Sequence, residues 1–334
     1  MIGKEKIIVL GSNSFSGASF VDYVLNDNPQ AVVTAISRSN EYDDLFLPYK
    51  NNNSGRVNFH RLDLNIHLDE IIDVIKNIHP DYIVNFSAQG MVGQSWEAPE
   101  QWFRTNCLAL MNLANVLKEE KYLKRFVQIS SPEVYGSCQG IIKEDTPLNP
   151  STPYAASKAA GDLSLLPFFK NFDFPLIYTR ATNVYGPHQA LYRIIPRSIV
   201  AIKKGNRIPL HGGGVAVKSY IHIRDVCSAT LAIARKGKNG DVYHISPGNS
   251  GISIKEVVRL ICEKLGKDFD SCVKIMSERL GQDAFYIIDS TKIRNEFNWK
   301  PEVGFEQGLN EVILWVEENF DELQKFPREY IHKP

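Results

Sequence analysis

Short β-branched runs alternate with longer helical patterns through the first half of the chain, and this alternation constrains the fold more than any other feature. Within residues 68–78, for example, apolar side chains recur every three to four positions, as on one face of a helix. Strands that alternate with helices predict a parallel sheet covered on both faces. The expected strands are Lys6–Leu10, Ala31–Ile36, Val57–His60, Tyr82–Phe86, Arg125–Ile129 and Leu176–Arg180.

The composition changes after the stretch NVYGP at residues 183–187, where glycine and proline become more frequent and the helical patterns shorten. We therefore predict an α/β fold, a Rossmann-type doubly wound parallel sheet with a smaller mixed α/β C-terminal lobe. The first domain is expected to span residues 1–183, with 219–235 returning to it. The second lobe then takes 184–218 and 236–334, including a helix that begins at the capping box Ser253-x-x-Glu256.

Charge and composition exclude several classes of partner. The chain of 334 residues has 38 Lys and Arg against 38 Asp and Glu, so nothing in the net charge predicts binding to nucleic acid or to an anionic membrane. No apolar run is long enough to span a bilayer, and the opening MIGKEKIIVLGSN enters a strand at once, which favours a cytoplasmic protein. The five cysteines lack metal-ligand spacing, so we expect reduced thiols and no metal site.

The stretch IIVLGSNSFSGASF reads as a strand, a tight polar turn and the start of a helix. Gly11 and Gly17 lie six residues apart, like the outer glycines of the G-x-x-G-x-x-G dinucleotide loop, while Ser14 takes the middle position and Phe15 follows it. Amide groups at a helix N-terminus can face a pyrophosphate, and small residues allow close approach. Turns of this kind also occur before helices that bind nothing.

The end of the second expected strand bears on the choice of dinucleotide. NAD-binding proteins usually place a carboxylate there for the ribose 2′-hydroxyl, whereas NADP-binding proteins offer an arginine to the 2′-phosphate. In this chain the sequence at that point is AISRSNEY, with Arg38 and no acidic residue before Glu41. The sequence therefore favours NADP over NAD, although Arg38 could also be an ordinary solvated loop residue.

Tyr154 and Lys158 are four residues apart in TPYAASKAAGD, which places them on one face of a helix. An ammonium group near a tyrosine stabilises the phenolate, which can take a proton from a sugar hydroxyl while hydride leaves the same carbon. This spacing alone is weak. It gains weight from its order in the chain, after the glycine loop and a strand ending in ISS, and before RATNVYGP.

With these motifs in place, the chain resembles the extended short-chain dehydrogenases/reductases that act on nucleotide sugars, and is most similar to the 4,6-dehydratases of dTDP-glucose and GDP-mannose. The matching stretches run almost end to end and include GSNSFSG, RLDLN, IVNFSAQ, QISSPEVYG, PYAASK, NVYGP, KSYIHIRDV and LGQDAFYIIDSTKI. The resemblance implies NAD(P) as cofactor and a nucleotide-diphosphate sugar as substrate, bound between the lobes. It also implies a homodimer that pairs through helices near 99–118 and 154–170.

The resemblance also assigns roles to individual positions. Ser131 would hydrogen-bond the C4 hydroxyl of the sugar, and Glu133 would remove the C5 proton once C4 is oxidised. The dTDP-glucose enzymes have an aspartate before this glutamate, which protonates the departing hydroxyl, whereas this chain has Pro132. Further implied cofactor residues are Asp63, Leu64, Ser87, Ala88, Gln89 and Asn106, and implied substrate residues are Asn183, Lys218 and Arg279.

Three functions stay open at this point. The first is an NADP-dependent nucleotide-sugar 4,6-dehydratase, which Glu133 favours because plain 4-epimerases usually carry only small residues there. The second keeps the cofactor but changes the chemistry, to an epimerase or a hexuronate decarboxylase. The third, a non-catalytic dinucleotide-binding scaffold, would have no use for the set of Ser131, Tyr154 and Lys158. QGMVGQSWE, at residues 89–97, departs from the dTDP pattern, which leaves the base and the sugar undecided.

Overall fold

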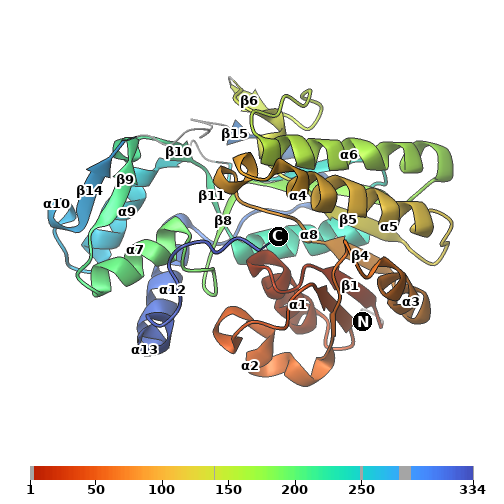
Figure 1. Cartoon of the computed structure of the whole chain (residues 1–334), viewed down its shortest axis with the longest axis horizontal. Helices are drawn as coiled ribbons and strands as arrows, with labels where there is room; N and C mark the ends of the chain where they lie inside the picture. The colour runs from red at the N-terminus through yellow and green to blue at the C-terminus, as the bar shows by residue number, and fades with distance from the viewer. Residues whose placement is uncertain (1–3, 139, 249–250, 278–286, 334) are drawn as a thin grey trace.

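The centre of the molecule is a parallel sheet of seven strands (Figure 1). The computed structural model describes all residues except 1–3, 139, 249–250, 278–286 and 334. The strand order is β12-β7-β5-β4-β1-β2-β3, and every neighbouring pair is parallel. These strands are β1 (Lys6–Leu10), β2 (Val32–Ser37), β3 (Val57–Arg61), β4 (Tyr82–Asn85), β5 (Arg125–Ile129), β7 (Leu176–Ala181) and β12 (Val242–Ile245).

The sheet is buried on both faces, as a parallel sheet between helices must be. Successive side chains of β1 point to opposite faces of the sheet, as in any strand. Ile7 and Val9 join an apolar cluster with α1 (Phe15–Asp27) and α8 (Ile223–Lys236). Ile8 and Leu10 join the opposite cluster, which includes side chains of α3 (Leu68–Ile78), α5 (Leu110–Leu117) and α6 (Pro153–Phe172).

The predicted α/β class is confirmed, and the six expected strands are present. β1 and β5 have the predicted bounds, and the other four differ by one residue at one or both ends. The sequence did not indicate β12, which pairs with β7 and so extends the main sheet past residue 236. The predicted domain limits stay a prediction, with the difference that Val242–Ile245 lies in the large sheet and not in the second lobe.

The second lobe packs its own apolar core beside the sheet, on the left in Figure 1. Its longer helices are α7 (Ile194–Lys203), α9 (Ile254–Lys264) and α12 (Phe305–Glu318). Ser253 caps α9 as predicted, because its Oγ accepts from the Glu256 amide at 3.1 Å. The shorter elements are α10 (Phe269–Cys272), α13 (Phe320–Leu323), β9 (Ile208–His211), β10 (Val217–Lys218), β13 (Ile252–Ser253) and β14 (Val273–Met276). The helix α11 (Thr291–Phe297) packs instead against β12 and α8, beside the large sheet.

Two further pairs of short strands are separate from the large sheet. β8 (Asn183–Tyr185) runs parallel to β11 (Tyr220–His222), and β6 (Ile141–Ile142) runs parallel to β15 (Ile287–Ile288). The first of these pairs joins the predicted return segment to the stretch NVYGP. Residues 49–53 form a further short helix, α2 (Tyr49–Asn53).

The expected helix at 99–118 is present but is not regular throughout. It consists of α4 (Pro99–Phe103), a π-helical segment η4 (Arg104–Ala109) and α5. The expected helix at 154–170 is α6, which begins one residue earlier and continues to Phe172, with Pro167 inside it. In the part of the chain that the structure describes, no helix combines the length and apolar character required to cross a bilayer.

Candidate functional site

The loop after β1 is built for close approach between backbones. Gly11 has φ +77°, a conformation that favours glycine, and a Cβ at this position would lie 2.6 Å from the Ser87 amide nitrogen. A Cβ on Gly17 would lie 2.4 Å from the carbonyl oxygen of Gly11. The two outer glycines are therefore required by the fold of the loop itself, independently of any ligand.

Ser14 explains how the loop does without a middle glycine. Its φ of −71° suits any residue, and its side chain caps α1, which begins at Phe15. Ser14 Oγ accepts from the Gly17 amide at 3.1 Å and donates to the Gly11 carbonyl at 2.7 Å. The N-terminus of α1 consequently lies at the carboxyl end of β1, where amide groups can bind a pyrophosphate. The geometry of the loop fits the predicted dinucleotide.

Arg38 directly follows β2, and its side chain contacts the loop after β4. Its Nη2 donates to Gln89 Oε1 at 3.3 Å and to the carbonyl oxygen of Lys333 at 2.9 Å. A pocket of about 480 Å³ opens here, beside the ends of β2 and β3. The residues that line it are Arg38, Ser39, Asn40, Glu41, Tyr42, Arg61 and Lys333.

Gln89 and Asn106 fix the loop after β4. The side chain of Asn106 accepts from the Gln89 amide at 2.7 Å and donates to the Gln89 carbonyl at 3.0 Å. Asn106 also donates to Ser157 Oγ at 2.9 Å, which ties this loop to α6. Its position in the π-helical segment is close against α6, since a Cβ on Gly161 would lie 2.1 Å from the Asn106 carbonyl oxygen.

The remaining predicted cofactor residues border the same edge of the sheet. The Ser87 amide donates to Asn85 Oδ1 at 3.0 Å, and Ala88 connects it to Gln89. Asp63 and Leu64 follow β3, and Asp63 Oδ1 accepts from the Asn65 amide at 2.8 Å. Their predicted contacts with the dinucleotide stay predictions.

Ser131, Glu133 and Tyr154 come together where β5 ends and α6 begins. Burial raises the pKa of the Tyr154 phenol, the charge of Glu133 raises it further, and a hydrogen bond with Ser131 lowers it. Ser131 Oγ also accepts from the Glu133 amide at 3.2 Å and so caps the turn η5 (Pro132–Tyr135). Pro132 occupies the first position of this turn, where its missing amide hydrogen costs nothing.

Lys158 lies one turn along α6 from Tyr154 and is buried. Its Nζ donates to the carbonyl oxygen of Ile129 at 2.8 Å. Burial lowers the pKa of Lys158 to about 8, a shift that Asp162 opposes. The predicted stabilisation of a Tyr154 phenolate by Lys158 stays a prediction.

The predicted substrate residues are less closely grouped. Asn183 begins β8, and its side chain donates to the Ser219 carbonyl oxygen at 3.3 Å. Lys218 lies in β10, and Arg279 lies outside the described residues. Arg193 was not predicted from the sequence, yet its positive charge lowers the pKa of Tyr154. Its only signal in the sequence is a basic residue directly before α7, a pattern too common to single out.

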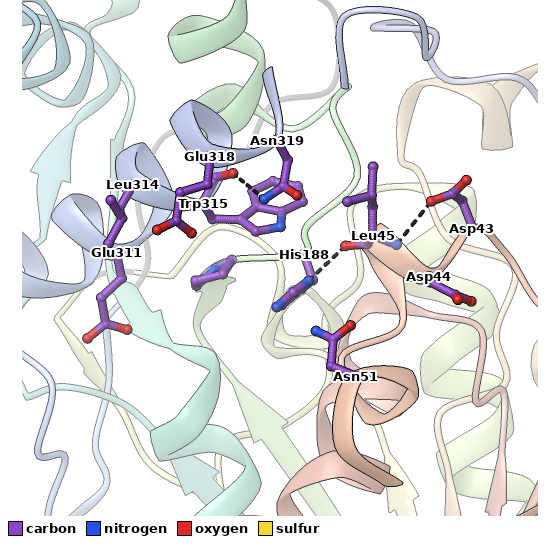
Figure 2. A pocket seen from close by; sticks show the side chains of 11 residues that line it. Asp43, Asp44, Leu45, Asn51, His188, Glu311, Leu314, Trp315, Glu318 and Asn319 are labelled. Carbon is purple, nitrogen blue, oxygen red and sulfur yellow. Dashed lines mark hydrogen bonds between the residues drawn. The ribbon is translucent and has the colours of Figure 1, made fainter. Parts of the chain in front are cut away.

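A second pocket, of about 530 Å³, lies between α12 and the loop after β2 (Figure 2). Trp315 and His188 lie among its lining residues, together with acidic side chains from both segments. His188 Nδ1 is 2.7 Å from the Leu45 carbonyl oxygen. None of the predicted site residues that the structure describes lines this pocket, so it is separate from the candidate site.

The chain is similar to known nucleotide-sugar dehydratases over most of its length. The family model described as GDP-mannose 4,6 dehydratase matches residues 8–312. The low-salt glycan biosynthesis protein Agl12 of Haloferax volcanii is 33% identical over 313 residues, which cover 92% of this chain and 97% of that protein. A dTDP-glucose 4,6-dehydratase of Streptomyces niveus is 35% identical over 251 residues, 75% of this chain and 74% of the relative.

A solved structure shares the complete fold. The dTDP-glucose 4,6-dehydratase of Bacillus anthracis, in complex with NAD, superimposes with a TM-score of 0.86 at 31% sequence identity. The match covers 95% of this chain and 98% of that one, so both lobes are included.

Proposed function

Because this chain belongs to the NAD-dependent epimerase/dehydratase family of extended short-chain dehydrogenases/reductases, we propose that its site oxidises a nucleotide sugar at C4 and then eliminates water across C5 and C6. The chain is thus an enzyme, a nucleotide-sugar 4,6-dehydratase that uses a nicotinamide dinucleotide. The observation that carries the mechanism is the position of Glu133. Its carboxylate lies close enough to Tyr154 to raise the pKa of the phenol.

A nicotinamide dinucleotide held at the loop of Gly11, Ser14 and Gly17 would supply the hydride acceptor for C4 and the hydride donor for C6. Tyr154 takes the proton of the C4 hydroxyl, and Ser131, which hydrogen-bonds Tyr154, orients both oxygens. Lys158 contributes a positive charge that favours the phenolate over the phenol. Asn183, Lys218 and Arg279 are proposed to bind the nucleotide-diphosphate part of the substrate, with Arg193 as an additional cation close to Tyr154.

Glu133 then acts as the base at C5, because oxidation of C4 makes the C5 proton acidic. Pro132 has no ionisable group, so an acid must come from elsewhere for the C6 hydroxyl to leave as water. Glu133 carries the C5 proton after the abstraction and is proposed to pass it to that hydroxyl, which leaves as water. A proton from solvent then returns to C5 as hydride is added at C6, and it balances the proton that Tyr154 took from the C4 hydroxyl. One carboxyl group would thus serve as base and acid in turn.

Glu133→Gln tests this assignment. The variant is expected to oxidise C4 and accumulate reduced dinucleotide, while water loss and solvent deuterium exchange at C5 fall together by about 10²–10⁴-fold. Exposed Glu119→Gln is the matched control and should retain parental rates. Mass spectrometry of products from dTDP-, UDP-, GDP- and CDP-sugars gives the baseline. If the parent gave products of unchanged mass, the function would be that of an epimerase. If the products had lost carbon dioxide, it would be that of a decarboxylase.

The preference for NADP over NAD is a separate proposal, since the solved relative described above holds NAD. What favours NADP is the pocket at the ends of β2 and β3, which is lined by Arg38, Arg61 and Lys333. Among the described residues that line this pocket, a 2′-phosphate would meet three cations and one carboxylate, Glu41, which is already paired with Lys50 at 2.6 Å. Calorimetric titration of both dinucleotides into the parent and Arg38→Ala decides the point. Tighter binding of NAD by the parent would contradict it.

The homodimer is likewise a proposal. Four large apolar side chains are exposed along the expected pairing helices: Phe103, Leu108, Leu163 and Phe172. The segments that carry them pack beside one another on one side of the sheet (Figure 1). Light scattering should give a dimer for the parent and a monomer for Leu163→Glu, whereas Val215→Glu in the second lobe should stay dimeric. A monomeric parent would refute the dimer. The cytoplasmic location stays a prediction.

A further inference from the structure

A buried ion pair lies beside Lys158 and has no part in the reaction steps described above. Arg180 Nη2, from β7, donates to Asp162 Oδ2, from α6, at 2.8 Å. Both side chains are only 4% exposed. Burying two charges is costly, and replacing such pairs by apolar residues is often neutral or stabilising. Stability alone therefore does not explain this pair.

Asp162 continues the catalytic face of α6. Tyr154, Lys158 and Asp162 follow one another at intervals of four residues and so lie along one side of the helix. Each of them is hydrogen-bonded to one of three consecutive residues where β5 ends. The contacts are Tyr154 with Ser131, Lys158 Nζ with the Ile129 carbonyl oxygen at 2.8 Å, and Asp162 Oδ2 with Ser130 Oγ at 2.6 Å.

Arg180 is held in place from its other side. Its Nη1 donates to the Tyr135 hydroxyl, which lies 2.7 Å from His244 Nε2. His244 Nδ1 is 3.1 Å from the Asp289 carbonyl oxygen and must donate to it, so Nε2 is the acceptor of the Tyr135 proton. Burial lowers the pKa of His244 to about 3, which keeps the ring neutral. These bonds hold the guanidinium of Arg180 between Asp162 and Tyr135.

We propose that Asp162 and Arg180 are positioning residues for the hydride-transfer site, which hold Lys158 against the end of β5 and balance the charge around its ammonium group. The proposal deepens the proposed function, in which Lys158 favours the Tyr154 phenolate. Asp162 attracts the ammonium and Arg180 repels it. Together the pair adds little net charge, whereas either residue alone would displace the titration of Lys158.

Other titratable groups surround this cluster and must be accounted for. Tyr154 shares α6 with Lys158, and Tyr178 donates from β7 to the Asp162 carbonyl oxygen. Tyr135 and Glu133 come from η5, and His244 comes from β12. In the apo protein that is titrated, burial raises the pKa of all three tyrosines and His244 is neutral, so these four carry no charge near pH 8. Glu133 is the same in the parent and in every variant compared.

Titration of Lys158 by NMR, on apo protein labelled with ¹³C at the lysine ε-carbon, tests the proposal without any substrate. Lys158→Met identifies the resonance by its loss. The midpoint should fall by about one pH unit in Asp162→Asn, because an attractive charge is removed and Arg180 is left unbalanced. In the double variant Asp162→Asn/Arg180→Gln the midpoint should return most of the way to the parental value.

The controls separate charge from architecture. Glu5→Gln breaks the distant Arg235–Glu5 ion pair of 2.6 Å and should leave the midpoint unchanged. If Asp162→Asn does not fold, Arg180→Gln gives the opposite test, a rise of the midpoint. An unchanged midpoint in the folded variants would overturn the proposal. A parent that converts no nucleotide sugar but shows these shifts would refute the proposed function and leave the positioning pair standing.

Discussion

Replacing Lys158 by methionine is expected to stabilise the folded protein while removing its activity. Burial lowers the pKa of Lys158 from its ordinary 10.5 to about 8. At about 1.4 kcal/mol for each pH unit, the buried ammonium costs the folded state on the order of 3 kcal/mol at pH 7. The substitution also leaves the Ile129 carbonyl oxygen without this donor, which costs about 1 kcal/mol. The expected net gain is on the order of 2 kcal/mol.

The pH dependence follows from the same shift. Between pH 8 and 10.5 the unfolded lysine binds more protons than the folded one, so this group makes the parent more stable as pH rises through that window. Below pH 8 both states are protonated and the cost is constant. Lys158→Met lacks the lysine, and its stability advantage over the parent should therefore shrink from pH 7 to pH 10. Urea unfolding of both apo proteins at these two pH values measures the difference.

Lys170→Met is the matched control, because Lys170 is exposed on the same helix. It should change the unfolding free energy by less than about 0.5 kcal/mol at either pH. The reasoning is refuted if Lys158→Met is no more stable than the parent at pH 7, or if its advantage is the same at pH 10. Activity of the variant near the parental rate would separately remove Lys158 from the mechanism.

Two further substitutions test the site. Tyr154→Phe should lower the rate of dinucleotide reduction by about 10²–10⁴-fold and leave dinucleotide affinity nearly unchanged, as measured by stopped-flow absorbance and calorimetry. Unchanged reduction would place the proton transfer elsewhere. Gly161→Ala should destabilise the fold by about 1–3 kcal/mol, because its Cβ would lie 2.1 Å from the Asn106 carbonyl oxygen. Gly55→Ala, which meets nothing within 4 Å, should be close to neutral, and equal melting temperatures for the two variants would contradict this explanation.

Several residues of the site could be predicted from the sequence because their roles depend on residues close by in the chain. Gly11 and Gly17 are needed wherever the backbone turns so tightly, and the four-residue interval of Tyr154 and Lys158 defines one face of a helix in any fold. The strand–helix alternation could also be predicted from local sequence, since the spacing of apolar residues reflects which side chains must be buried. These features depend on residues close together in the chain, and for that reason the sequence alone determined them.

The contacts that set the chemistry join residues far apart in the chain. β12 is a four-residue strand that gains its place only by pairing with β7, and its His244 is 109 residues from Tyr135. Arg193 carries no local signal, yet the fold brings its charge close to Tyr154. Asp162 and Arg180 read as ordinary charged residues until the packing of α6 on β7 buries them together. Only tertiary packing decides which charges lose their water, and so it alone settled the electrostatics around Tyr154 and Lys158.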